Sequence, residues 1–173
     1  MAGFPINRAP VLTLWAAVVA QRLGFGRDEA LTLGRAVAGL TAYRKGVRLG
    51  LFEPTPKEVR EKREKLKPGA RLTIALLGCP VEVVHTAGGI RALAKGKPDT
   101  PAAVERYLAA KFGDHLDAAR KAMTALARSR TPAQLAREGF RLYEQFRPSI
   151  PAGEAGWGAK GMLDLAKIRA LAR

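Results

Sequence analysis

The chain has 173 residues, 47% of them apolar, and its thirty Lys and Arg against fifteen Asp and Glu give a formal net charge of +15. This size suits one compact domain, and the single cysteine, Cys79, excludes an intramolecular disulfide and fits the reducing cytoplasm. The charge is spread along the whole chain, which indicates a folded basic body with an acidic partner, most simply nucleic acid. Charge that serves only solubility is the alternative.

An apolar run occupies residues 10–20, about half the ~20 residues needed to span a bilayer. Gln21 and Arg22 follow it at once, so the run predicts a buried helix and no membrane partner. A second apolar stripe extends to Arg44, which predicts an N-terminal helical pair within residues 9–52.

Residues 17–37 place small and apolar side chains around a glycine. Gly24 suits a left-handed turn, Ala20 would let two helices approach, and apolar residues would fill the space between them: Leu23, Phe25, Ala30, Leu31 and Leu33. This pattern resembles the helix-turn-helix of bacterial DNA-binding proteins.

The resemblance implies that Arg27, Thr32 and Arg35 would contact DNA, whereas Asp28 and Glu29 would repel phosphate. An ordinary αα-hairpin needs the same glycine and apolar residues, and it remains the alternative.

Two groups of basic residues surround glycines. One consists of Arg44, Lys45 and Arg48 around Gly46, and the other of Arg91, Lys95 and Lys97 around Gly96. Glycine lets a backbone approach phosphate while the cations neutralise it, so both groups suit sequence-independent phosphate contacts. The alternative is that these cations satisfy carbonyls at helix C-termini.

Three Thr-Pro pairs, at 55–56, 100–101 and 131–132, mark helix starts, because threonine can cap free amides and proline fits the first helical turn. The first predicts an exposed helix over 56–67. Apolar spacing predicts further helices over 101–112 and from about 116 to 126, and a last one from Thr131 to Phe146. We expect these last three to form an antiparallel cluster within residues 100–147.

Residues 71–86 are rich in β-branched residues, and large apolar side chains alternate with smaller or polar ones before a Gly-Cys-Pro interruption, which predicts one small β-hairpin. Cys79, Glu82 and His85 in this hairpin are the best candidates for an enzyme, with thiol and imidazole within reach across the ladder. A buried thiol and an ordinary histidine are the simpler interpretation.

Residues 151–173 form a Pro- and Gly-rich C-terminal segment around Trp157, with a short docking helix over about 163–171. This segment would bind a protein partner, or a second copy of the chain, if the protein is an interaction or scaffold module.

These patterns predict a mainly α-helical fold, a bundle of six or seven helices with one small β-hairpin at 71–86, in a single domain over residues 1–150. The predicted function is non-catalytic nucleic-acid binding, DNA before RNA, through phosphate contacts. We expect no catalytic residue, no metal and no cofactor. The alternatives are the interaction module and, after it, a small Cys/His enzyme.

Overall fold

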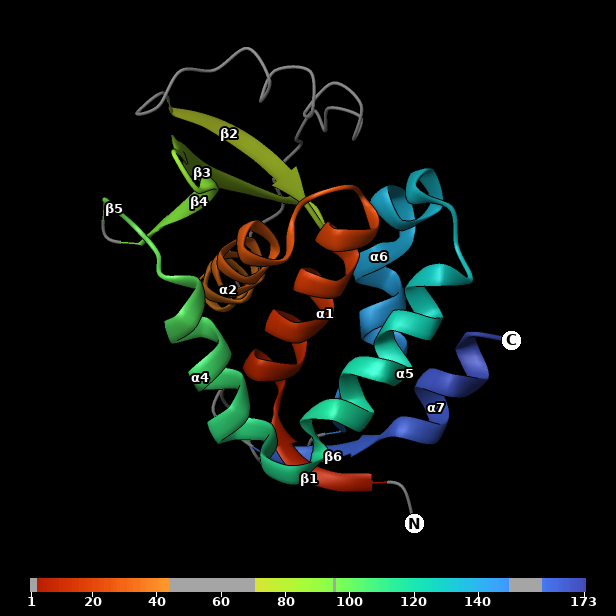
Figure 1. The fold of residues 1–173 in the computed structure, drawn as a ribbon. Helices are drawn as coiled ribbons and strands as arrows, with labels where there is room; N and C mark the ends of the chain where they lie inside the picture. The colour runs from red at the N-terminus through yellow and green to blue at the C-terminus, as the bar shows by residue number, and fades with distance from the viewer. Residues whose placement is uncertain (1–2, 44–70, 95, 150–159) are drawn as a thin grey trace.

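A computed structural model describes residues 3–43, 71–94, 96–149 and 160–173 (Figure 1). Several sequence predictions lie outside these residues: the helix at 56–67, the Trp157 segment, and the basic residues Arg44, Lys45, Arg48 and Lys95.

Helix α1 (Arg8–Arg22) runs through the centre of the molecule, and every residue from Pro10 to Ala20 is buried (Figure 1). A helix that is apolar all round must be covered on every side, so the predicted buried helix is confirmed. Trp15 is fully buried, donates its Nε1–H to the Gly139 carbonyl over 2.8 Å and meets Phe146 edge to face at 5.3 Å. Of the helices in the described residues, none is long and apolar enough to cross a bilayer.

Helix α2 (Arg27–Tyr43) folds back along α1 after a turn in which Gly24 has a φ of 111°. The two helices approach most closely at Gly34, where a β-carbon would lie 2.9 Å from the Ala17 nitrogen and would also collide with the Thr13 carbonyl oxygen. The small residue that permits close packing is therefore Gly34, on α2.

A four-stranded antiparallel sheet lies against α2, in the order β2-β3-β4-β5. The predicted hairpin forms from β2 (Arg71–Leu76) and β3 (Cys79–Thr86), joined by Leu77 and Gly78, both with positive φ as a tight hairpin turn requires. Strands β4 (Gly89–Ala94) and β5 (Lys97–Pro98) extend it.

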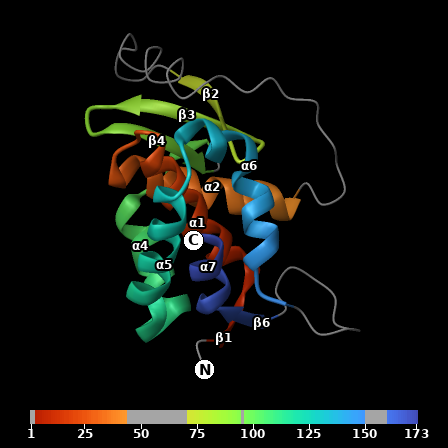
Figure 2. The ribbon, with the colours of Figure 1, turned by 90° about the vertical axis from the view of Figure 1, so that its right-hand side faces the viewer.

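Helices α4 (Pro101–Phe112), α5 (Leu116–Arg128) and α6 (Pro132–Phe146) begin within about two residues of their predicted starts, with a 3-10 turn at Gly113–His115. Thr131 and Gln134 form the expected capping box on α6. The three helices surround α1 and do not form a separate antiparallel cluster (Figures 1 and 2), because α1 needs apolar cover on all sides.

The two ends of the described chain meet in a second sheet. Strand β1 (Gly3–Asn7) pairs antiparallel with β6 (Lys160–Asp164), with Phe4 opposite Leu163. Helix α7 (Leu165–Leu171) follows and packs on α5 through its buried Leu165 and Ile168.

The predicted helical bundle with one hairpin is wrong, because the described residues form two antiparallel sheets with six strands beside the helices, a mixed α/β fold. Residues 89–94 pair with β3 and place Ile90 and Ala92 in the core, although Ala and Leu in that segment are also good helix formers. Strand β1 finds its partner about 150 residues away in the sequence.

Candidate nucleic-acid interface

The segment that resembles a helix-turn-helix folds as two helices with buried Leu23 and Phe25 between them, an arrangement that an αα-hairpin shares. The beginning of α2 packs against β4. Glu29 Oε2 accepts a hydrogen bond from the Ile90 amide at 2.8 Å, and Thr32 Oγ1 accepts one from the Ala92 amide at 3.1 Å. Thr32 is fully buried, so its side chain is not available to a ligand on the surface.

Arg27 and Arg35, the predicted DNA contacts on α2, are exposed and half-buried, respectively, and both have carboxylate partners. Arg27 Nη2 lies 3.4 Å from Glu105 Oε1, and Arg35 Nε lies 3.4 Å from Asp99 Oδ2. The Arg35 guanidinium also lies 5.9 Å from the centre of the Tyr107 ring. Both pairs reduce the local positive potential, and the more exposed one, at Arg27, is of the weak surface kind.

Arg91 and Lys97 lie on the sheet. Arg91 is half-buried and donates Nη1–H to the Ile90 carbonyl over 2.9 Å, whereas Lys97 is exposed on β5. Lys97 pairs with Ala94, three residues along β4 from Arg91, which separates the two cations by roughly 10 Å along the strand. Arg71, exposed at the start of β2, is a third cation of this sheet, and it pairs with Val84 of β3 as Arg91 does from the other side. The described sheet therefore presents three cations on three separate strands.

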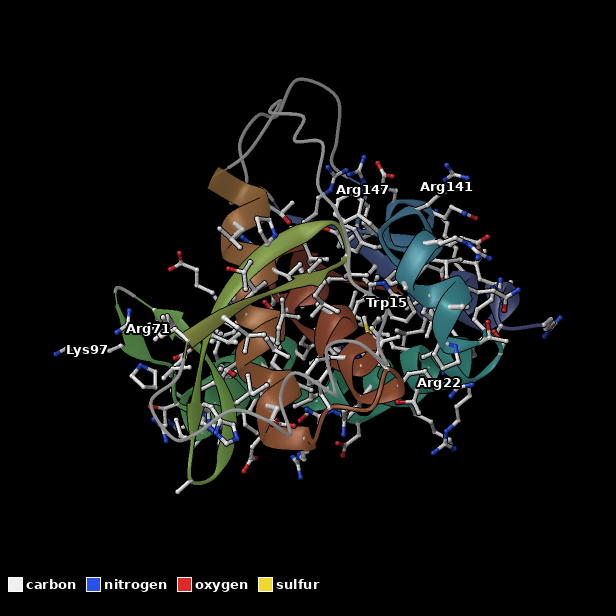
Figure 3. The ribbon with its side chains drawn as sticks, turned by 90° about the horizontal axis from the view of Figure 1, so that it is seen from above. Trp15, Arg22, Arg71, Lys97, Arg141 and Arg147 are labelled. Carbon is white, nitrogen blue, oxygen red and sulfur yellow. The ribbon has the colours of Figure 1, made fainter. Side chains whose placement is uncertain are left out.

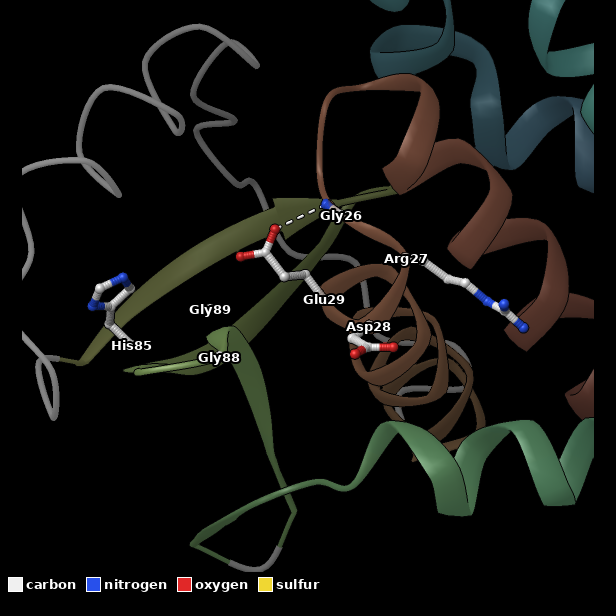
Figure 4. Close-up of a pocket in the computed structure, with 7 residues that line it drawn as sticks. All are labelled: Gly26, Arg27, Asp28, Glu29, His85, Gly88 and Gly89. Atoms are coloured by element: carbon white, nitrogen blue, oxygen red, sulfur yellow. Dashed lines mark hydrogen bonds between the residues drawn. The ribbon is translucent and has the colours of Figure 1, made fainter.

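An open hollow of about 600 Å³ lies between the start of α2 and the β3–β4 turn (Figure 4). Gly88 and Gly89 line the hollow, and Gly89 begins strand β4. Neither glycine therefore stands at a helix N-terminus, where free amides would attract an anion. The Glu29 carboxylate accepts hydrogen bonds from the amides of Gly26, at 2.9 Å, and Ile90. It occupies the amides that an incoming anion would use, and Asp28 adds a second negative charge to the wall.

The three residues considered for catalysis are not brought together. Cys79 and His85 lie at opposite ends of β3, roughly 20 Å apart at the usual rise per strand residue. Glu82 is exposed and points to the opposite sheet face, because side chains alternate along a strand. The buried Cys79 sulfur lies 3.6 Å from Thr41 Oγ1. No thiol–imidazole pair forms at this site.

The largest excess of positive charge gathers on α5, α6 and α7. Residues 116–149 and 160–173 carry eleven basic and four acidic side chains, against nine and six in the other described residues. All three helices lie on the side of the molecule that faces the viewer in Figure 2. We call their exposed cations the basic face: Lys121, Arg128, Arg137, Arg141, Lys167, Arg169 and Arg173.

Among the residues that the structure describes, the cations of the basic face have no carboxylate partner. The ion pairs within the described residues involve Arg27, Arg35 and Arg120, and no residue of the basic face. Glu138 and Glu144 lie on α6 among the arginines, yet neither pairs with a cation of the described chain. Figure 3 places Arg22 and Arg141 on one side of the molecule, and Arg71 and Lys97 on the opposite side.

Two further arginines beneath this face hold helix ends together. Arg22 donates Nη2–H to the Arg130 carbonyl over 3.1 Å, and Arg130 donates to the Leu171 carbonyl over 3.1 Å. These bonds satisfy one carbonyl just beyond the C-terminal end of α5 and one in the last residue of α7, where cations are favoured. Arg22 and Arg130 are thus structural, and they fix the helices that display the exposed cations.

At the edge of α6, Arg8 and Arg147 add positive potential. Arg8 Nε–H donates to the Pro148 carbonyl over 3.0 Å, and burial, followed by the nearby charge of Arg147, lowers the pKa of Arg8. Burial also raises the pKa of Tyr143, which packs beside them, to about 12. This corner adjoins the C-terminal end of α6, which carries Arg141 (Figure 3).

The sequence predictions do not include the basic face, although the sequence carries a signal for it. Arg137 and Arg141 are four residues apart, and Lys121 and Arg128 are seven apart, so each pair shares one face of its helix. Comparison with protein-family models, with curated proteins and with solved structures finds no match.

Proposed function

We propose that this protein binds nucleic acid without catalysis, DNA before RNA, through phosphate contacts made by the basic face. The observation that carries the proposal is the exposure of seven cations on α5, α6 and α7 without a carboxylate partner among the described residues. A phosphate backbone releases counterions when such cations replace them, and this provides affinity without sequence readout. The single cysteine supports a cytoplasmic setting for this activity.

The surface favours a duplex over a single strand. Single-strand binders stack bases on exposed aromatic rings. None of the aromatic residues whose side chains the structure describes is exposed, and Tyr107 and Phe140 are the half-buried ones. Phosphate contact with a double helix needs cations alone, which is what the basic face offers.

The interaction-module alternative gains no support from the described surface. Met162, at 44% exposure, is the one large apolar side chain exposed in the described residues. Protein interfaces of standard size have an apolar core, and a single methionine does not form one.

The test is a triple variant that removes one cation from each helix of the basic face: Arg128→Gln, Arg141→Gln and Arg169→Gln. All three side chains are exposed, so the fold should be retained. We expect weaker binding to random duplex DNA, with the slope of log K against log salt flattened by up to about three. The readout is fluorescence anisotropy at several salt concentrations.

The matched control removes the same charge from other surfaces: Arg71→Gln, Lys97→Gln and Arg106→Gln, all at exposed positions. We expect a much smaller change of slope. A flattened slope in the control and an unchanged slope in the first variant would indicate that the phosphate contacts lie on the sheet side and not on the basic face. An unchanged slope in both variants would contradict any contact by these six cations.

A further inference from the structure

A pocket of about 280 Å³ opens between α1, α2 and α5, and none of the seven cations of the basic face lines it. Its floor is apolar and belongs to the core: Leu14, Val18 and Leu31 are at most 5% exposed. Gln21 and two arginines, Arg27 and Arg120, stand at its rim. An apolar cavity with a few convergent polar groups is the usual form of a small-molecule site, and this volume lies just below the usual range of roughly 300–1,000 Å³.

The rim carries one positive charge in excess. Arg120 Nη2 donates to both oxygens of Glu105, at 2.9 and 3.0 Å, and Arg27 Nη2 lies 3.4 Å from the same carboxylate. Two guanidiniums thus share a single carboxylate. Within the described residues, neither Nε nor Nη1 of Arg120 has a hydrogen-bond acceptor, so this side chain keeps donors for another anion.

We propose that this pocket binds a small monocarboxylate with a short apolar body, a straight chain or a single ring. The apolar body would lie against Leu14, Val18 and Leu31, where burial removes its surface from water. The carboxylate would take the free donors of Arg120 and balance the excess charge at the rim, since a guanidinium fork matches a carboxylate in shape and charge.

The charge of the rim decides between ligands of equal size. An alcohol with the same carbon chain as the carboxylate can pack against the apolar floor, but it leaves the arginine charge unbalanced. An ammonium is repelled by that charge. A carboxylate is therefore the ligand that uses both parts of the pocket.

The experiment titrates hexanoate, hexan-1-ol and hexylammonium separately into the full chain and follows the methyl resonances of Val18 and Leu31 by NMR. We expect saturable shifts with hexanoate and at least about tenfold weaker binding of hexan-1-ol. Hexylammonium should not bind. Equal binding of all three probes would show an apolar cavity without a carboxylate site, and the absence of any saturable shift at about 10 mM hexanoate would remove the site altogether.

Three variants locate the binding. Gln21 is exposed at the rim, so Gln21→Trp should block entry without disturbing the core. Arg120→Gln should weaken hexanoate at least about tenfold, whereas Arg106→Gln, an exposed change on α4, should not. Hexanoate binding that survives both Gln21→Trp and Arg120→Gln would overturn the proposal.

Discussion

The close approach of α1 and α2 at Gly34 leads to a sharp stability prediction. An added methyl group at this position would meet two backbone groups of α1, the Thr13 carbonyl and the Ala17 nitrogen. Backbone atoms cannot move aside as a side chain can, so the two helices must separate. The resulting loss of stability should lie at the upper end of the about 1–3 kcal/mol that is typical of overpacking. The better helix propensity of alanine offsets roughly 1 kcal/mol of this loss. We therefore expect Gly34→Ala to lower the free energy of unfolding by about 2 kcal/mol.

Gly39 provides the matched control on the same helix. A β-carbon there meets nothing within 4 Å, so Gly39→Ala should raise the free energy of unfolding by about 0.5 to 1 kcal/mol through propensity alone. Urea unfolding followed by far-UV circular dichroism measures both variants. If Gly34→Ala is as stable as Gly39→Ala, the contact between the two helices at Gly34 is not as close as described.

Three further changes test other parts of the fold by the same urea measurement. Thr131→Ala should lower the free energy of unfolding by about 1 kcal/mol because it removes the capping box. Thr100 makes no side-chain cap hydrogen bond, so Thr100→Ala should lower it far less. Equal losses in the two variants would show that Thr131 does not cap α6. Thr32→Val should lower the free energy of unfolding by about 1–3 kcal/mol, because the buried Ala92 amide loses its hydrogen-bond acceptor. A loss as small as that of a surface substitution would contradict the hydrogen bond between Thr32 and Ala92. Burial holds the pKa of Tyr143 near 12, so the folded chain keeps a proton that the unfolded chain releases above pH 10. The free energy of unfolding should then fall by about 1.4 kcal/mol per pH unit between pH 10 and 12, and Tyr143→Phe should lack this component.

Local signals in the sequence predicted the elements that depend on neighbouring residues. The capping box at Thr131, the β2–β3 hairpin and the apolar α1 need only a few adjacent positions, and all three are present. The hairpin turn itself lies at Leu77 and Gly78, whereas Cys79 and Pro80, predicted to interrupt the hairpin, pair within it. Pairings between distant segments could not be predicted in this way. Five residues of β1 have no partner nearby, and only the folded chain brings β6 beside them.

The candidate site was missed for a related reason. In the sequence the cations next to glycines, Arg91 and Lys97 among them, stand out, and the charge excess is spread evenly along the chain. Folding places α5, α6 and α7 on one side of α1, so cations from separate segments share one surface (Figure 2). Thr32 shows the opposite effect, because a polar residue that suited a DNA contact is buried as a hydrogen-bond acceptor for β4.

The most direct test of nucleic-acid binding is fluorescence anisotropy of the unaltered chain with random duplex DNA and with single-stranded RNA at several salt concentrations. We predict tighter binding to the duplex, with log K falling against log salt by roughly 0.9 for each phosphate contacted. Absence of binding to both nucleic acids even at ~50 mM salt would contradict the proposed function and leave the charge of +15 as a solubility property.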